Sequence, residues 1–548
     1  MPSYLQRLAL VLAFIQLSKV SALVNPTVIL DNGTFIGTTD GVSSRFLGIP
    51  FARPPIGDLR FRLPQPIEPY KGEYSVGSYG PSCPQQAITL PIIKDLPADV
   101  VNYMADSIYG FLFPDSEDCL TINVFKPEDA NANSNLPVLV WIFGGGFVLG
   151  GPSMYDGASI VSRSVLINNP VIVVSMNYRY SPRFGFMASR EVKEAKVGNL
   201  GLHDQREAFR WIQKYIRNFG GDPSKVTIWG ESAGAISVAL HMVAYDGDTQ
   251  GLFRAGIMQS GAPIPVGDIT NGQQYYDFVV SDTGCAGSVD TLECLRRVPY
   301  DRLKAAIDKT PSVFAYQALH LAWLPRADGV LFSDHPQRLV QRGKIARIPY
   351  ITGDCDDEGT FFSLSNLNVT TDDELKEYIQ SVFLPGVTEV EVDRMLLEYP
   401  RNISQGSPFN TGPFNAITPQ YKRIAAFQGD GVFQGPRRWM LDYTADSQDA
   451  WVFLSKRLKA LPVLGSVHAH DLLNSYGGGE LQNYIIRFAN VLNPNLDSFL
   501  NFNWPKYRLS NRQMITFVDS FPPVTITLDN YRVSAMNYLN QVVLRNPV

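Results

Sequence analysis

The residues best placed to do chemistry lie in the pentapeptide Gly230-Glu231-Ser232-Ala233-Gly234. Residues 225–229 before it predict a short buried strand, and residues 233–243 after it predict a helix. A serine on a sharp turn from strand to helix, between glycines that leave room for the tight backbone, is typical of a nucleophile. Free N–H groups at the start of the helix favour negative charge there. We therefore predict that Ser232 is the nucleophile of a serine hydrolase.

A Gly-x-Ser-x-Gly pattern is short enough to occur by chance, and a surface turn is the alternative interpretation. The context favours the catalytic one, because residues 219–223 (Phe-Gly-Gly-Asp-Pro) precede the predicted strand and a helix follows the serine. The order of strand, turn and helix is the setting in which such a serine acts.

A nucleophilic serine needs a base and an acid, and in the α/β fold that carries this strand-turn-helix serine they follow it in the order serine, acid, histidine. Among six histidines, only His468 and His470 lie late in the chain within a predicted loop. A predicted strand at residues 348–353 is followed by four acids, which are Asp354, Asp356, Asp357 and Glu358. Strand ends hold the chemistry of open α/β sheets, although a hydrated loop is also rich in acids. Spacing alone leaves both the base and the acid undecided.

Residues 136–143 predict another strand, which ends in Gly144-Gly145-Gly146-Phe147. Glycines at a strand end let backbone N–H groups approach a ligand, and a flexible turn is the alternative. In a serine hydrolase this position supplies the oxyanion hole, together with the N–H of the residue after the nucleophile. The predicted donors are Gly145, Gly146 and Ala233.

Strands and helices alternate along the first half of the chain. Strands are predicted at residues 136–143, 170–178, 225–229 and 253–259, and a helix at residues 202–219. This order predicts an α/β fold with a large, mostly parallel central sheet and helices on both faces. Residues 24–50 predict a small N-terminal antiparallel sheet. The chain has no linker or internal repeat, so we expect one domain over residues 23–548.

The first residues have the pattern of a secretory signal peptide. A positively charged start, an apolar stretch at residues 8–17 and small residues at 20–22 predict cleavage after Ala22, so residues 1–22 would be removed and the protein secreted. No later run is long and apolar enough for a transmembrane segment. The net charge of −5 and the lack of basic clusters argue against nucleic acid as a partner.

Five cysteines in a secreted chain predict two disulfides and one free thiol. Proximity in sequence favours Cys285–Cys294, which leaves Cys83–Cys119 as the second pair and Cys355 unpaired. We expect no metal, because the sequence has no Cys-x-x-Cys or His-x-x-x-His spacing. Three sequons predict N-glycosylation where they are exposed, at Asn32, Asn368 and Asn402.

The segment between Cys83 and Cys119 has the pattern of an amphipathic helix. Polar residues recur at helical spacing from Asp95 to Asp106, and apolar residues fill the opposite face. A surface helix packed on the core is one interpretation. The other is a lid over residues 84–118 that covers the site in water and turns its apolar face towards lipid.

Several segments resemble the type-B carboxylesterases and lipases. Residues 219–234 resemble the central signature of this family, and residues 116–124 (Ser-Glu-Asp-Cys-Leu-Thr-Ile-Asn-Val) resemble its second signature. Residues 252–365 are most similar to secreted fungal lipases of the Candida rugosa and Geotrichum type. The resemblance runs from about residue 24 almost to the C-terminus, and it implies the α/β-hydrolase fold.

The resemblance also implies roles for single residues. Ser232 would be the nucleophile, Glu358 the acid and His468 the base, with Gly145, Gly146 and Ala233 as oxyanion donors. It supports the two disulfides and a lid between the first pair. It implies an ester hydrolase that needs no cofactor.

The implied function is a lipase acting on long-chain acylglycerols or sterol esters at an oil–water interface. An esterase for short soluble esters is the alternative within the same class of enzyme. An inactive cholinesterase-like binding protein is the alternative from another class. The sequence does not distinguish a monomer from a homodimer.

Overall fold

The structure is a computed structural model that describes residues 24–88, 114–180, 185–495 and 502–548. The predicted signal peptide and most of the predicted lid lie outside these ranges. Within them, no helix combines the length and the apolar character needed to cross a membrane.

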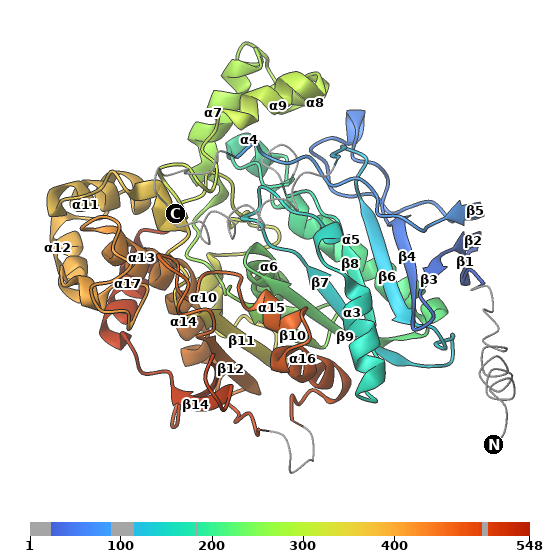
Figure 1. Cartoon of the computed structure of the whole chain (residues 1–548). Coiled ribbons are helices and arrows are strands. Elements are labelled where there is room, and N and C mark those ends of the chain that lie inside the picture. Colours follow the sequence, from blue (N-terminus) through green and yellow to red (C-terminus); the bar gives the residue numbers. More distant parts are fainter. Residues whose placement is uncertain (1–23, 89–113, 181–184, 496–501) are drawn as a thin grey trace, which may run out of the picture.

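The described residues form an 11-stranded sheet that runs through the molecule (Figure 1). Its strands, in spatial order, are β14 (Val524–Leu528), β13 (Gln513–Phe517), β12 (Ala450–Ser455), β11 (Tyr350–Cys355), β10 (Ala255–Gln259), β9 (Gly221–Glu231), β7 (Leu136–Ile142), β8 (Ile172–Met176), β6 (Thr121–Pro127), β4 (Ser43–Pro50) and β3 (Thr38–Thr39). The run from β13 to β8 is parallel, whereas the pairings at both edges are antiparallel. The central strands read as continuous apolar runs because both faces of the sheet are covered.

Helices cover both faces of this sheet (Figure 1). One face carries α3 (Gly157–Leu166) and α16 (Glu480–Val491), and the other carries α5 (Leu200–Tyr215) and α6 (Ala233–Val243). The predicted α/β fold is therefore confirmed. The helix predicted at residues 233–243 has the same bounds in the structure, because a strand end fixes its start.

The remaining helices lie around the sheet: one group projects at the top of Figure 1, another gathers at its left, and others pack against α6 and α16. They are α4 (Arg190–Glu194), α7 (Gln273–Asp282), α8 (Thr291–Arg297), α9 (Tyr300–Asp308), α10 (Pro336–Gln341), α11 (Asp372–Tyr378), α12 (Glu389–Glu398), α13 (Tyr421–Gly429), α14 (Gly435–Thr444), α15 (Leu472–Ser475) and α17 (Val533–Arg545). A π-helical segment, Asp430–Gln434, joins α13 to α14. This segment matters below because π-helical turns often occur at functional sites.

The N-terminal sheet differs in detail from the prediction. It contains β1 (Thr27–Leu30), β2 (Asn32–Ile36) and β5 (Lys71–Ser75). β1 pairs with β2 in antiparallel fashion, but β2 pairs with β5 in parallel. The other early strands, β3 and β4, join the edge of the main sheet instead. Strand pairing across an intervening segment is not visible in a local sequence pattern, so this sheet is mixed rather than antiparallel.

Two disulfides link loops around the sheet. Cys83 is bonded to Cys119, and Cys285 to Cys294, which are the pairs that the sequence predicts. Cys355 is a free, buried thiol at the end of β11.

Candidate active site

Ser232 lies at the turn where β9 ends and α6 begins. Its backbone has φ 55° and ψ −125°, a conformation that residues with a side chain rarely adopt and that often marks a functional site. The glycines of the motif make this turn possible. A Cβ on Gly234 would lie 1.9 Å from the carbonyl oxygen of Ile142, and one on Gly230 would lie 2.4 Å from the carbonyl carbon of Gly234. The two glycines of the motif are thus required because the backbone packs closely around the serine.

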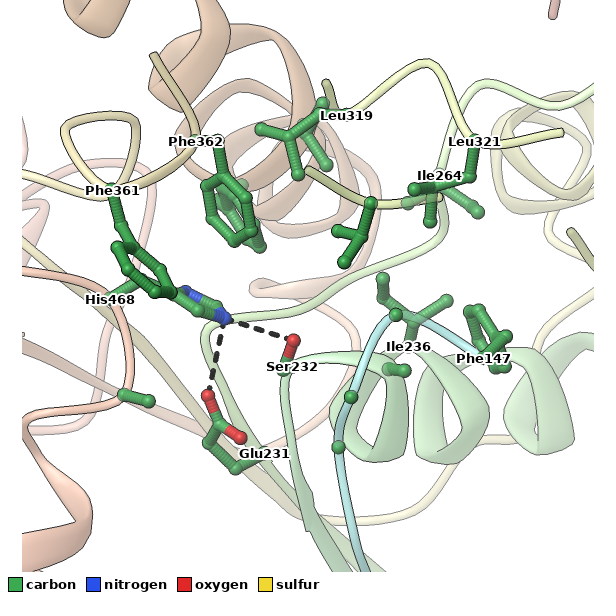
Figure 2. Close-up of a pocket in the computed structure, with 18 of the residues that line it drawn as sticks. Phe147, Glu231, Ser232, Ile236, Ile264, Leu319, Leu321, Phe361, Phe362 and His468 are labelled. Atoms are coloured by element: carbon green, nitrogen blue, oxygen red, sulfur yellow. Dashed lines mark hydrogen bonds and ion pairs between the residues drawn. The ribbon is translucent and has the colours of Figure 1, made fainter. Parts of the chain in front are cut away.

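A chain of hydrogen bonds joins Ser232 to His468 and Glu358. His468 Nε2 lies 2.9 Å from Ser232 Oγ, and His468 Nδ1 lies 2.5 Å from Glu358 Oε2. The bond from Ser232 to His468 is drawn in Figure 2. An ionised carboxylate can only accept a hydrogen bond, so Nδ1 of His468 carries a proton. Nε2 of the same ring is directed at the hydroxyl of Ser232. This is the arrangement by which a histidine activates a serine.

The carboxylate of Glu358 is held by two further donors. Its Oε1 accepts from the backbone N–H of Cys355 at 2.6 Å and from Ser260 Oγ at 2.7 Å. Ser260 follows β10 and has φ 55°, so its own backbone is in the left-handed region. The acid is therefore fixed by the ends of two neighbouring strands, β10 and β11.

The other candidates for acid and base have separate partners. His470 Nε2 lies 2.7 Å from Ser455 Oγ, away from the serine. Asp354 forms an ion pair with Arg437, while Asp356 and Asp357 both pair with Lys459. Sequence spacing left open which histidine is the base and which residue is the acid. Of these candidates, the structure brings only His468 and Glu358 to Ser232.

The predicted oxyanion donors line the same cavity as Ser232. Within the described ranges, the backbone N–H groups of Gly145, Gly146 and Ala233 donate to no protein acceptor. Gly145 has φ 113°, and a Cβ there would lie 2.1 Å from the carbonyl oxygen of Leu149. Glycine is therefore required for this loop to fold beside the serine. Unused amides at this place suit a developing negative charge.

Acidic residues control the charge of His468. Burial opposes its protonation, but the carboxylates of Glu358 and Glu231 outweigh burial and raise the pKa of His468 to about 9. Glu231 Oε1 lies 3.3 Å from His468 Nε2, as Figure 2 shows. Burial raises the pKa of Glu231 to about 8. Two aromatic rings, Phe362 and Phe433, pack against the imidazole with centroid distances of 5.2 and 4.7 Å.

An apolar cavity of about 830 Å³ opens beside Ser232 (Figure 2). Part of the lining, including Asp156, Leu473 and Gly477, is exposed to solvent. Other lining side chains are buried and hydrophobic, among them Leu324, Phe383, Leu384, Leu539 and Val543, and we call this part the buried end of the cavity. Ser232 therefore lines a cavity with both a solvent-exposed part and a buried apolar part.

Sequence reasoning missed two residues of this site. Glu231 lies within the recognised motif, but the pattern gave no reason to place its side chain beside the histidine. Ser260 directly follows the predicted strand at residues 253–259, and its position at a strand end was the available signal. Both contacts depend on how neighbouring strands are aligned.

The predicted glycosylation sites lie on the surface. The side chains of Asn32, Asn368 and Asn402 are exposed, which is the condition attached to their prediction. Their modification stays a prediction.

A strand-turn-helix serine with a histidine, a carboxylate and free amides, on a mostly parallel sheet, defines a serine hydrolase of the α/β-hydrolase fold. The carboxylesterase family model matches residues 24–471, and the chain belongs to that family of ester hydrolases. Lipase 4 of Diutina (Candida) rugosa is 45% identical over 92% of this chain and 93% of that lipase.

Two further similarities agree with this membership. A secreted triacylglycerol lipase of Gibberella zeae is 38% identical over 94% of this chain and 90% of its own length. The crystal structure of Aspergillus niger EstA superposes with a TM-score of 0.79 at 26% identity, covering 96% of this chain and 99% of that one. The family and the fold implied by the sequence resemblance are thus confirmed.

Proposed function

We propose that this protein is a secreted lipase that hydrolyses long-chain acylglycerols through an acyl-enzyme, with sterol esters as a further substrate class to be tested. One observation carries the proposal. The hydrogen-bonded chain of Ser232, His468 and Glu358 opens into a cavity whose inner end is buried and apolar. Such a cavity gains free energy by taking a hydrocarbon chain out of water, at roughly 0.8 kcal/mol per buried CH₂.

The reaction follows from the positions of these groups. Ser232 Oγ attacks the ester carbonyl carbon while His468 Nε2 takes the hydroxyl proton, and Glu358 stabilises the imidazolium that forms. His468 then gives this proton to the leaving alcohol as the C–O bond breaks. Water repeats the sequence, so that the acyl-enzyme is hydrolysed to a fatty acid and free serine. The proposed oxyanion donors are the N–H groups of Gly145, Gly146 and Ala233.

The two ends of the cavity suggest where each part of the ester lies. An acyl chain has no polar group beyond its carbonyl, so the buried end suits it. The leaving alcohol, a diacylglycerol when the substrate is a triacylglycerol, is bulky and must depart as the acyl-enzyme forms, which suits the solvent-exposed part of the cavity near Asp156 and Leu473. The similarity to lipases, one of them named as a secreted triacylglycerol lipase, supports acylglycerols as the substrate class.

A substrate series tests the proposal. We expect hydrolysis of emulsified long-chain triacylglycerols, with a rate that rises as the substrate passes its solubility limit if residues 84–118 act as a lid. Ser232→Ala is the matched control and should lower kcat by about 10⁶ without changing the melting temperature. Activity confined to short soluble esters would replace the lipase with an esterase, and full activity of the variant would overturn the mechanism.

The compartment is proposed from the N-terminal pattern and from the relatives. Residues 1–22 read as a signal peptide, and two disulfides suit an oxidising compartment. Similar proteins include lipases named as secreted. Sequencing the N-terminus of protein recovered from culture medium should begin at residue 23, and glycosidase treatment should reduce its mass if the exposed sequons are used.

A further inference from the structure

A nitrogen-bearing side chain, His320, stands among the apolar residues that line the cavity. Its chain neighbours Leu319 and Leu321 line the cavity as well and are labelled in Figure 2. Its Nδ1 lies 3.0 Å from the backbone carbonyl oxygen of Phe383, a residue of the buried end. His320 therefore stands within the path that we propose for the acyl chain.

The hydrogen bond to Phe383 fixes which nitrogen of His320 carries a proton. A carbonyl oxygen can only accept, so Nδ1 is the donor and Nε2 of the neutral ring has a lone pair. Burial lowers the pKa of His320 to about 4, which keeps the ring neutral at neutral pH. Nε2 has no protein partner in the described ranges, and it is not among the polar atoms that protein fully encloses. It is thus an accessible hydrogen-bond acceptor on a residue that lines the cavity.

The cavity lining also includes a glycine, Gly431, close to Phe383. Gly431, in the π-helical segment, has no side chain, and a Cβ there would lie 3.4 Å from Leu539 Cδ2 and 3.8 Å from Phe383 Cε1. The structure therefore keeps room at the buried end next to the residue that holds the imidazole. A plain hydrocarbon chain in this space would displace water from Nε2 without replacing its hydrogen bond, which carries a free-energy cost.

The geometry points to His320 as a specificity residue that accepts a hydrogen bond from a hydroxyl group carried on the acyl chain of the substrate. This inference rests on the proposed function, and it narrows the substrate class to esters of hydroxylated fatty acids. A hydroxyl at the matching chain position would donate to Nε2 while the rest of the chain stays in the apolar cavity. Because a buried acceptor is costly to leave unpaired, we expect a preference of about tenfold over the unsubstituted chain.

The test compares stearoyl esters with a panel of monohydroxystearoyl esters that differ only in the position of the hydroxyl. In the wild-type enzyme, kcat/KM should be about tenfold higher for the best hydroxy isomer than for the parent ester. The preference should fall away when the hydroxyl is moved several carbons along the chain. Equal rates for all isomers and the parent would overturn the inference.

Two variants separate the acceptor atom, Nε2, from the hydrogen bond that Nδ1 donates to Phe383. His320→Asn places an amide nitrogen near the position of Nδ1, so it keeps a donor for the Phe383 carbonyl but has no atom at Nε2. His320→Gln places a polar atom near Nε2. We expect the Asn variant to lose the preference, because the stearoyl ester no longer leaves an acceptor unpaired at Nε2, and the Gln variant to keep part of it; the readout is the ratio of the two kcat/KM values in each variant. An unchanged preference in His320→Asn would overturn the inference.

A binding measurement keeps this test independent of turnover. Calorimetry with the Ser232→Ala protein should show that the best hydroxystearic acid binds about tenfold more tightly than stearic acid, and that His320→Asn in the same background removes the difference. Failure of the wild-type enzyme to hydrolyse any ester would overturn the proposed function. The ratio of affinities would still decide whether His320 accepts a hydroxyl.

Discussion

The candidate site has two regions that are built differently. The polar floor, which we define as Ser232, Ser260, Glu358 and His468, is fixed by short hydrogen bonds at the ends of β9, β10 and β11 and in the loop after β12. The apolar wall is the cavity lining contributed by the segments outside the sheet: Leu319, His320, Leu321, Phe383, Gly431 and Leu539. In the floor each polar atom has a specified partner, whereas in the wall shape and volume matter most.

This difference suggests that the chemistry and the choice of substrate can be changed separately. The floor depends on strand ends, whose positions are fixed by a sheet buried on both faces. The wall depends on loops and short helices, which tolerate change without disturbing the sheet. Substitutions in the floor should therefore affect every ester alike, and substitutions in the wall should act on particular substrates.

The largest effect is expected from Glu358→Gln. Its amide can present the wrong hydrogen-bonding group to His468 Nδ1 and so favour the wrong tautomer of the imidazole. A comparable change in a serine protease lowers kcat by about 10⁴, and we expect a loss of that order for short and long esters alike. Kinetics on both ester types and a melting curve check this. A loss restricted to long esters would contradict the separation of floor and wall.

The sequence predicts the floor better than the wall. The bounds of α6, the strand before Ser232 and the glycine turn after β7 follow from local patterns, because period, glycine placement and apolar runs are local properties. The fold class follows from the order of these elements. Ser232 and the three amides could be proposed as candidates on the same basis, and their roles stay predictions.

The acid and base could not be chosen from local patterns alone. His468 and His470 lie two positions apart in one loop, and four acids follow β11. The selection depends on which partners lie alongside, such as Arg437 for Asp354 and Lys459 for Asp357. These contacts join residues about a hundred positions apart, which only the resemblance to a family could supply.

The wall could not be predicted at all. Its residues lie between positions 319 and 539. The sequence pattern predicted only helices and loops for some of these segments and no particular element for the others. Apolar residues in such segments look the same whether they face a core or a cavity. The place of Gly431 beside Leu539 and Phe383 and the place of His320 in the cavity lining become visible only once these segments are packed together.

The next largest effect is expected from Gly431→Leu, which tests the wall. Gly431 does not have a positive φ, so the backbone accepts a side chain, and the leucine would fill the space beside Leu539 and Phe383. We expect kcat/KM for long-chain esters to fall by about 10- to 100-fold while butyrate esters are hydrolysed as before. A series of p-nitrophenyl esters of increasing chain length checks this, with Gly431→Ala as the smaller control. An equal loss on all chain lengths would place Gly431 outside the acyl path.

A smaller effect is expected from Ser260→Ala, which weakens the floor without removing a reacting group. Ser260 Oγ is one of two donors to Glu358 Oε1, and the N–H of Cys355 remains when the hydroxyl is lost. We expect kcat to fall by about five- to tenfold on short and long esters alike, because the variant loses the free energy of one hydrogen bond to a charged group. Steady-state kinetics on both esters measure this. Unchanged activity would show that the backbone donor alone positions the acid.

The smallest effect at neutral pH is expected from Glu231→Gln, and it is seen most clearly in the pH profile. His468 must be neutral to act as a base, so activity falls as pH drops through its pKa, which nearby carboxylates raise to about 9. Glu231 lies 3.3 Å from Nε2 and has a pKa raised to about 8, so it becomes anionic as pH rises through that value and then favours the imidazolium. Glutamine cannot ionise, so the acid limb of kcat/KM should move to lower pH.

The pH profile of a shorter acid separates charge from packing. Glu231→Asp keeps an ionisable carboxylate, so its acid limb should stay nearer to that of the wild type than the limb of Glu231→Gln does. The difference between the Gln variant and the wild type should be largest between about pH 8, where Glu231 becomes charged, and about pH 9, where His468 titrates, and it should vanish at higher pH. Identical profiles for all three proteins would show that Glu231 supports the turn at Ser232 only by packing. The carboxylate that sets the charge of His468 would then be Glu358.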